Sequence, residues 1–188
     1  MIDQPIGIIG GGAWGTALAS VMAQTHAEVR LWALEPEVIA AINSGQGNPI
    51  YLAGQTLPPQ IRATGDIAEL ADCSALLLVT PAQHLRATLG SLPPTNAPLL
   101  LCSKGIEADT QMLVSEVVAA VRPGNPIAVL SGPTFAHEVA AGKPTAITLA
   151  CENQALGAQL MRLVATPAFR PYWSDDIVGA EIGGAVKN

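Results

Sequence analysis

The sequence predicts an α/β fold, with a doubly wound, mostly parallel sheet and helices on both faces. Short apolar runs alternate with helical stretches along almost the whole chain, and this order favours parallel strands joined by right-handed crossovers. The run "ALLLVT" at 75–80 is apolar rather than alternating, as expected for a strand covered on both faces. A glycine-rich turn follows the first apolar run. Together these features indicate a fold of the Rossmann type.

The expected strands are apolar runs bounded by turn residues. In chain order they are 5–10, 28–32, 61–64, 74–80, 98–102, 127–130, 145–150 and 169–173. The expected helices are 14–24, 36–43, 66–71, 82–90, 110–121, 134–141 and 154–164. Pro36 and Pro133 suit the first turn of a helix, where the N–H that proline lacks is unpaired in any case. The Gly- and Pro-rich stretch 44–60 is expected to be an irregular loop, and its length points to a function.

The composition limits the classes of function. Of the 188 residues 49% are hydrophobic, which favours one sizeable folded domain, with room for the beginning of a second, over a disordered chain. The net charge is -6 and the nine Lys and Arg residues are spread singly, so a nucleic-acid surface is not expected. A small anionic ligand is compatible with this charge, because backbone N–H groups can hold a phosphate.

Further features concern the cellular compartment and metals. No apolar stretch reaches the roughly 20 residues of a membrane-spanning helix, and the start "MIDQP" lacks the basic region of a signal peptide. Cys73, Cys102 and Cys151 are widely spaced, which fits reduced thiols in the core of a cytoplasmic protein. The three histidines lack the spacing of a helical metal site, so no metal is expected.

The glycine turn is the first candidate site. Gly10, Gly12 and Gly15 form the pattern Gly-x-Gly-x-x-Gly between the first strand and the first helix. In a dinucleotide site the first glycine makes the turn, the second lets the pyrophosphate approach the backbone, and the third lets the helix pack on the strand. An ordinary glycine-rich turn would give the same pattern, but the flanking elements favour a dinucleotide. Trp14 lies inside the turn, where either packing or contact with the ligand would explain it.

The charge after the second strand bears on the choice between NAD and NADP. In dinucleotide folds an acidic residue there binds the ribose hydroxyls of NAD, whereas an arginine binds the 2′-phosphate of NADP. Glu35 lies in this region and positions 33–35 hold no arginine. The sequence therefore favours NAD, although Glu35 could instead cap the helix that begins at Pro36.

Two of the three lysines stand in unusual surroundings. Lys104 follows a strand at the carboxyl edge of the predicted sheet, where open α/β sheets bind ligands. Lys187 ends a helical pattern interrupted by Gly183 and Gly184. Two glycines inside a helix destabilise it by about 2 kcal/mol relative to alanine, which suggests that another group approaches this helix closely. Solvated surface positions are the alternative for both lysines.

Six segments together resemble a known family. One of them, "SGPTFAHE" at 131–138, is on its own either an ordinary helix start or a second anion or amide site. The six are "GGGAWGTALA", "NPIYLAGQTLP", "VTPAQHLR", "CSKGIE", "SGPTFAHEVAAGKPTA" and "GAEIGGAVKN". Their order and spacing look like the amino-terminal domain of bacterial-type NAD(P)-dependent glycerol-3-phosphate dehydrogenase, over essentially the whole chain. The resemblance implies reversible reduction of dihydroxyacetone phosphate to sn-glycerol 3-phosphate, for glycerophospholipid synthesis.

The resemblance also implies roles for single residues. Lys187 would be the catalytic acid/base, and Lys104 would contact both substrate and cofactor. Gly132, Thr134 and Asn188 would lie at the substrate with the two lysines. The residues that would bind the cofactor are Gly10, Gly12, Ala13, Trp14, Gly15, Leu34, Glu35, Lys104, Gly132 and Ala136. This assignment fits the chemistry, because reduction of a ketone leaves an alkoxide that needs a proton donor and a nearby positive charge.

The expected organisation is a dinucleotide-binding domain over 1–176, with 177–188 as the start of a helix that leads to a helical substrate domain absent from this chain. Two alternatives share the glycine turn. One is a non-catalytic dinucleotide-binding module, and the other is a related lysine-dependent dehydrogenase of a hydroxy acid or ketopantoate. The expected partner is a small phosphate-bearing substrate, with no nucleic acid and no membrane, and the longer protein could form a homodimer.

Overall fold

An eight-stranded sheet organises residues 1–187, the part of the chain that the computed structural model describes, with side chains for residues 1–186. The strand order is β3-β2-β1-β4-β5-β6-β7-β8. The strands are β1 (Ile6–Ile9), β2 (Val29–Trp32), β3 (Ile61–Thr64), β4 (Leu76–Leu78), β5 (Leu99–Leu101), β6 (Ile127–Ser131), β7 (Thr145–Ala150) and β8 (Phe169–Ser174). Each strand lies where the sequence predicts one. The doubly wound, Rossmann-type fold is therefore confirmed.

The helices follow the predicted order, with differences at their starts. They are α1 (Ala13–Met22), α2 (Pro36–Asn43), α3 (Ala82–Ser91), α4 (Val114–Val121), α5 (Ala136–Ala140), α6 (Gln154–Val164) and α7 (Ile177–Lys187), together with the 3-10 helix η1 (Ile67–Leu70). The helix expected from 110 begins only at Val114, because 102–113 forms a loop. The helix expected from 134 begins at Ala136 with Phe135 as its N-cap, so the prediction that Pro133 occupies its first turn is wrong.

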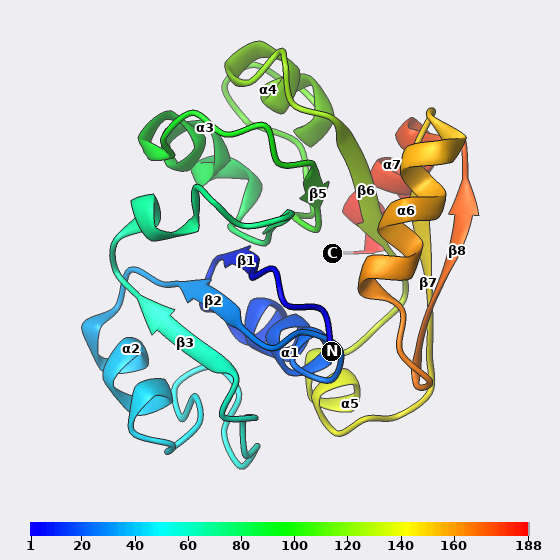
Figure 1. Ribbon diagram of the computed structural model, residues 1–188. Helices are drawn as coiled ribbons and strands as arrows, with labels where there is room; N and C mark the ends of the chain where they lie inside the picture. Colours follow the sequence, from blue (N-terminus) through cyan, green and yellow to red (C-terminus); the bar gives the residue numbers. More distant parts are fainter. Residues whose placement is uncertain (188) are drawn as a thin grey trace.

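Helices cover both faces of the sheet (Figure 1), as the apolar run at 75–80 predicts. Leu77 belongs to the core beneath α1, α2, α5 and α6, whereas Leu76 and Leu78 belong to the core beneath η1, α3 and α4. All three leucines have no exposed surface. The three cysteines are buried and free, as expected of small core residues.

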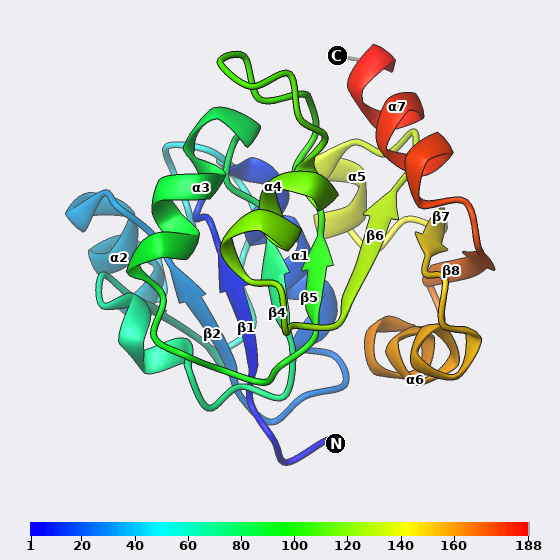
Figure 2. The ribbon, with the colours of Figure 1, turned by 90° about the horizontal axis from the view of Figure 1, so that it is seen from above.

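One strand pair departs from the predicted parallel order. β7 runs antiparallel to β6, whereas every other neighbouring pair in the described sheet is parallel. The connection between β6 and β7 contains only the five-residue α5, and helical periodicity in a connection does not fix the direction of the next strand. The parallel strands β1 to β6 still end at a common carboxyl edge, and α7 lies beside that edge (Figure 2).

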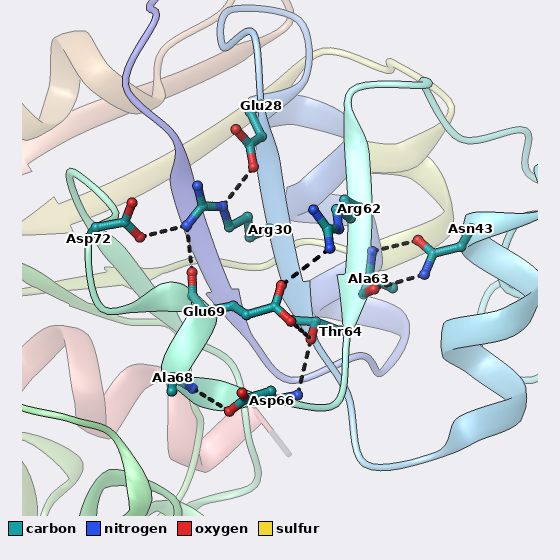
Figure 3. Close-up of polar contacts among 10 residues, drawn as sticks. All are labelled: Glu28, Arg30, Asn43, Arg62, Ala63, Thr64, Asp66, Ala68, Glu69 and Asp72. Atoms are coloured by element: carbon teal, nitrogen blue, oxygen red, sulfur yellow. Dashed lines mark hydrogen bonds and ion pairs between the residues drawn. The ribbon is translucent and has the colours of Figure 1, made fainter.

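The β3 edge of the sheet is held by polar contacts (Figure 3). Asn43, at the end of α2, donates to the carbonyl of Ala63 over 2.8 Å and accepts from its N–H over 2.9 Å, so it pairs with the outer strand as a neighbouring strand would. On β2, Arg30 donates to Glu28 over 2.6 Å and to Asp72 over 2.5 Å. The Asn43 contact covers part of an edge strand that could otherwise pair with another chain.

Among the described residues no helix is long and apolar enough to cross a membrane.

Candidate active site

Two adjoining cavities lie at the carboxyl edge of the sheet. The first, called the turn cavity, has a volume of about 470 Å³ and is lined by the glycine turn together with Trp32, Leu34, Glu35, Tyr51 and His84. The second, called the lysine cavity, has a volume of about 390 Å³ and is lined by Lys104, Thr134, Phe135 and Ala136, among others. Both contain Trp14, Val79, Thr80 and Pro81 in their walls. The two cavities therefore adjoin past the end of β4, and together they are called the groove.

The three glycines of the turn are required for different reasons. Gly10 has a φ of +128°, which L side chains rarely adopt, and a Cβ there would lie 3.0 Å from the backbone N of Thr80. A Cβ on Gly15 would lie 1.9 Å from the carbonyl oxygen of Gly10. A Cβ on Gly12, in contrast, would have none of the described atoms within 4 Å. The fold itself therefore does not demand glycine at position 12, but a ligand seated against this backbone would.

Polar groups in the shared wall also indicate a ligand. Among the described residues, Trp14 Nε1 and the buried Thr80 Oγ1 have no hydrogen-bond partner. Gly12 is the N-cap of α1 and provides no side-chain cap, so the N–H groups of the first turn face the turn cavity without partners in the helix. Buried polar groups are normally paired. The residues present thus fit a diphosphate at the turn, with further polar ligand atoms near Trp14 and Thr80.

The loop at 44–60 reaches the turn cavity through Tyr51. Asn48 is buried and donates to the carbonyl of Gly11 over 2.9 Å and to the hydroxyl of Thr16 over 2.8 Å. Its own carbonyl accepts from the backbone N of Tyr51 over 3.2 Å. The Tyr51 hydroxyl then donates to Glu35 over 2.8 Å, and this hydrogen bond raises the pKa of Tyr51. Asn48 thereby fixes the loop to the glycine turn, and Tyr51 holds the Glu35 carboxylate at the cavity.

Lys104 brings a positive charge into the second cavity. Its Nζ donates to the carbonyl of Gly132 over 3.4 Å, which links the loop after β5 to the segment after β6. Cys102 also lines this cavity, and burial raises the pKa of its thiol. Lys104 is thus the one basic residue among the described residues of this lining, which include no Asp or Glu, a suitable environment for a phosphate-bearing or oxyanionic ligand.

The close approach expected at α7 is present at Gly184, whereas a Cβ on Gly183 would meet none of the described atoms within 4 Å. A Cβ on Gly184 would lie 2.7 Å from Ser131 Oγ and 3.7 Å from Lys104 Cγ. Lys187 follows Gly184 by three positions, so its backbone lies on the same side of α7. Glu181 ties α7 to the start of α4, accepting from the N and the hydroxyl of Ser115 over 2.8 and 2.6 Å.

The structure gathers most of the predicted site residues. Gly10, Gly12, Ala13, Trp14, Gly15, Leu34 and Glu35 line the turn cavity, and Trp14, Lys104, Thr134 and Ala136 line the lysine cavity. Gly132 joins them through its contact with Lys104. The Lys187 side chain and Asn188 lie outside what the structure describes. Within the described residues no three His, Cys, Asp or Glu side chains gather as a metal site would require.

Comparison with known proteins decides the family. The family model described as "NAD-dependent glycerol-3-phosphate dehydrogenase N-terminus" matches residues 5–157. The chain belongs to the glycerol-3-phosphate dehydrogenase family. A relative from Erythrobacter litoralis named glycerol-3-phosphate dehydrogenase [NAD(P)+] is 56% identical over 183 residues, covering 97% of this chain and 56% of its own length.

Other glycerol-3-phosphate dehydrogenases agree. A relative from Caulobacter vibrioides with the same name is 52% identical over 191 residues, covering 100% of this chain and 58% of its own length. A crystal structure of the enzyme from Coxiella burnetii is 32% identical with a TM-score of 0.88, covering 97% of this chain and 57% of that chain. The chain thus spans about half the length of the relatives that it matches.

Several residues of the site region carried no functional prediction. Asn48, Tyr51 and Thr80 meet the glycine turn from distant parts of the sequence, and Glu181 reaches Ser115 across 66 positions. The only sequence signal for the first two was the length and composition of the loop at 44–60. Their contacts could not be predicted, because hydrophobic periodicity and turn patterns report local structure alone.

Proposed function

We propose that this chain forms the dinucleotide-binding part of a glycerol-3-phosphate dehydrogenase, an enzyme that interconverts dihydroxyacetone phosphate and sn-glycerol 3-phosphate for glycerophospholipid synthesis. NAD(H) or NADP(H) would occupy the turn cavity and extend past Trp14 toward Lys104. The observation that carries the proposal is the open space beside Gly12, a position where the fold does not require glycine. This space lies at the start of a helix, where anions bind readily. The turn cavity that contains it adjoins the cavity lined by Lys104.

Each part of the site has a task in this reaction. The bound nicotinamide supplies or accepts the hydride. The N–H groups at the start of α1 bind the diphosphate, and the glycines admit it to the backbone. Lys104 stabilises the negative charge that develops on the substrate oxygen during reduction. Lys187 donates its Nζ proton to that oxygen and takes it back during oxidation. The role of Lys187 rests on the family resemblance.

Lys104 also separates this proposal from the non-catalytic alternative. A module that only binds a dinucleotide needs no cation beyond the glycine turn, whereas Lys104 lines the adjoining cavity and contacts Gly132. Family membership favours the glycerol phosphate substrate over a hydroxy acid or ketopantoate.

The test is an assay of the longer protein with dihydroxyacetone phosphate and each reduced cofactor. We expect oxidation of the nicotinamide that depends on the ketone, and its loss in Lys104→Met. Ketopantoate in place of dihydroxyacetone phosphate should give no turnover. Equal activity of Lys104→Met and wild type would contradict the role given to Lys104, and absence of turnover with dihydroxyacetone phosphate would contradict the reaction.

Finer points of the proposal follow from the same residues. NAD(H) is preferred because the Glu35 carboxylate would repel the 2′-phosphate of NADP(H). Residues 1–176 form the dinucleotide-binding domain, and α7 leads toward a helical substrate domain in the longer protein. The enzyme works in the cytoplasm, where Cys73, Cys102 and Cys151 stay reduced. The longer protein forms a homodimer, and light scattering, which measures its mass in solution, tests this.

A further inference from the structure

The segment between β5 and α4, residues 102–113, is called the Lys104 loop. Ser103, the residue before Lys104, anchors this loop on one side. Figure 2 shows this loop rising beyond the carboxyl end of β5. The Ser103 hydroxyl lies within hydrogen-bond distance of two carbonyl oxygens at the end of β4, those of Leu78 at 3.1 Å and Thr80 at 2.6 Å. On the other side of Lys104, Gly105 has a φ of +120°. Because glycine rotates freely, the Lys104 backbone needs a second anchor beyond Gly105.

That second anchor comes from helix α3. The Gln83 side chain donates from Nε2 to the carbonyl of Ile106 over 2.8 Å and accepts from the N–H of Ala108 over 2.8 Å. One amide side chain thus binds both backbone groups of a short loop segment. Such a two-point contact fixes the direction of the backbone as well as its distance from the helix.

One turn further along α3, Arg86 binds Glu107, the residue between Ile106 and Ala108. Its Nε lies 3.0 Å from Glu107 Oε1 and its terminal nitrogen 2.7 Å from Oε2, a two-point ion pair. Thr110 donates to the same carboxylate over 2.5 Å. The Glu107 side chain is only 9% exposed, so little water competes for these contacts.

Helix α3 also forms part of the groove. Its N-cap, Pro81, lines both cavities, and His84 lines the turn cavity. The same short helix therefore borders the dinucleotide end of the groove and holds the loop that carries Lys104.

We propose that Gln83 and Arg86 are positioning residues, which hold the Lys104 loop through Ile106, Glu107 and Ala108 and so place the Lys104 ammonium in the lysine cavity. The value of this placement for catalysis rests on the proposed function. The placement itself does not, and it can be tested without turnover.

The test uses the small number of lysines. The chain has three, Lys104, Lys143 and Lys187, so reductive ¹³C-methylation gives few NMR signals, and these are assigned by Lys→Arg variants. In Gln83→Ala and in Arg86→Gln, the Lys104 signal should move toward that of the exposed Lys143. Hydrogen exchange at the Ala108 N–H should rise about fivefold in Gln83→Ala, as expected for loss of one hydrogen bond.

Gln154→Ala, at an exposed position in the first turn of α6, is the matched control and should leave all signals in place. Gln83 is exposed, so its replacement by alanine in a helix should not prevent folding. A Lys104 signal that keeps its wild-type position in both Gln83→Ala and Arg86→Gln would overturn the proposal. Addition of NADH or NADPH to wild type is a separate arm: signals that do not respond to either would contradict the proposed function and leave the result on positioning intact.

Discussion

At the scale of single residues, Gly12 separates the needs of the fold from those of the ligand. A Cβ has room there, and the φ of −71° is accessible to any residue. We therefore predict that Gly12→Val folds normally but binds NADH about tenfold more weakly or worse, because the side chain fills the space next to the backbone that a diphosphate would approach. Isothermal calorimetry with NADH measures the difference.

Gly90→Val is the matched control for this substitution. Gly90 lies near the end of α3, and a Cβ there also meets none of the described atoms within 4 Å. It lines neither cavity, so NADH affinity should stay at the wild-type value. Equal affinity of Gly12→Val and wild type would show that the diphosphate binds elsewhere.

Glu35 and Tyr51 form the second pair of interest at this scale. Because the Tyr51 hydroxyl holds the carboxylate at the turn cavity, we predict that NADH binds more tightly than NADPH and that Glu35→Gln narrows the difference by strengthening NADPH binding. Tyr51→Phe should narrow it less, since the charge remains. Dissociation constants of NADH and NADPH for wild type, Glu35→Gln and Tyr51→Phe measure these differences. Tighter binding of NADPH than of NADH by wild type would show that Glu35 does not contact the ribose.

At the scale of elements, the two neighbouring glycines of α7 should behave in opposite ways. Gly184 faces the Ser131 hydroxyl, which would have to move to admit a Cβ, whereas a Cβ on Gly183 meets none of the described atoms within 4 Å. We predict that Gly184→Ala lowers the free energy of unfolding by about 1–2 kcal/mol and that Gly183→Ala raises it by about 0.5–1 kcal/mol through helix propensity. Urea unfolding curves give both values.

Ser131→Ala identifies the cause of the Gly184 effect. Removal of the hydroxyl makes room for a Cβ on α7, so Gly184→Ala should cost less in the Ser131→Ala background than in wild type. If the cost is the same in both backgrounds, the close approach of Ser131 is not what requires glycine at position 184.

The contact between α3 and the Lys104 loop should depend on pH. The hydrogen bond from Arg86 holds the pKa of Glu107 below its usual value of 4.5. A carboxylate whose pKa is lower in the folded than in the unfolded state stabilises the fold. This stabilisation is complete at pH values above the unfolded-state pKa and is lost as the pH falls through the folded-state pKa. We therefore predict that Glu107→Gln lowers the melting temperature at pH 7 and that the gap to wild type narrows below pH 4.5.

Thermal unfolding monitored by circular dichroism at a series of pH values measures this gap. Glu138→Gln, which removes the exposed pair between Glu138 and Lys143, is the control and should give a small gap at every pH. A gap for Glu107→Gln that is independent of pH would mean that the carboxylate charge does not stabilise the loop.

At the scale of the whole molecule, local patterns determined what the sequence could predict. The strands are short apolar runs between Gly, Pro and polar residues, so their positions were predicted. The glycine turn can be recognised from the sequence because all its members lie within six positions. The antiparallel β7 and the late start of α5 were missed, since neither leaves a periodic signal. Gln83, Arg86 and Glu107 were missed for another reason: their contacts join segments more than twenty positions apart.

The whole molecule also sets an expectation for activity. Both cavities are formed by the Rossmann-type fold, and the chain spans about half the length of its relatives. We predict that the 188-residue chain binds NADH but reduces dihydroxyacetone phosphate far more slowly than the longer protein, because orientation of a substrate can contribute ~7 to 11 kcal/mol to catalysis. Steady-state assays of the 188-residue chain and of the longer protein at saturating cofactor measure the two rates. Comparable rates would show that the 188 residues are sufficient for catalysis.

The placement of the tryptophans gives the protein its own optical reporter. Trp14 and Trp32 line the turn cavity, whereas Trp173 lies on β8 with its indole N–H bonded to the carbonyl of Cys151 over 3.0 Å. Reduced nicotinamide absorbs light in the range where indole emits, so occupancy of the groove should transfer excitation from the first two rings to the ligand. Trp173 would then supply a nearly constant background. Site occupancy can thus be followed in dilute solution without any added dye.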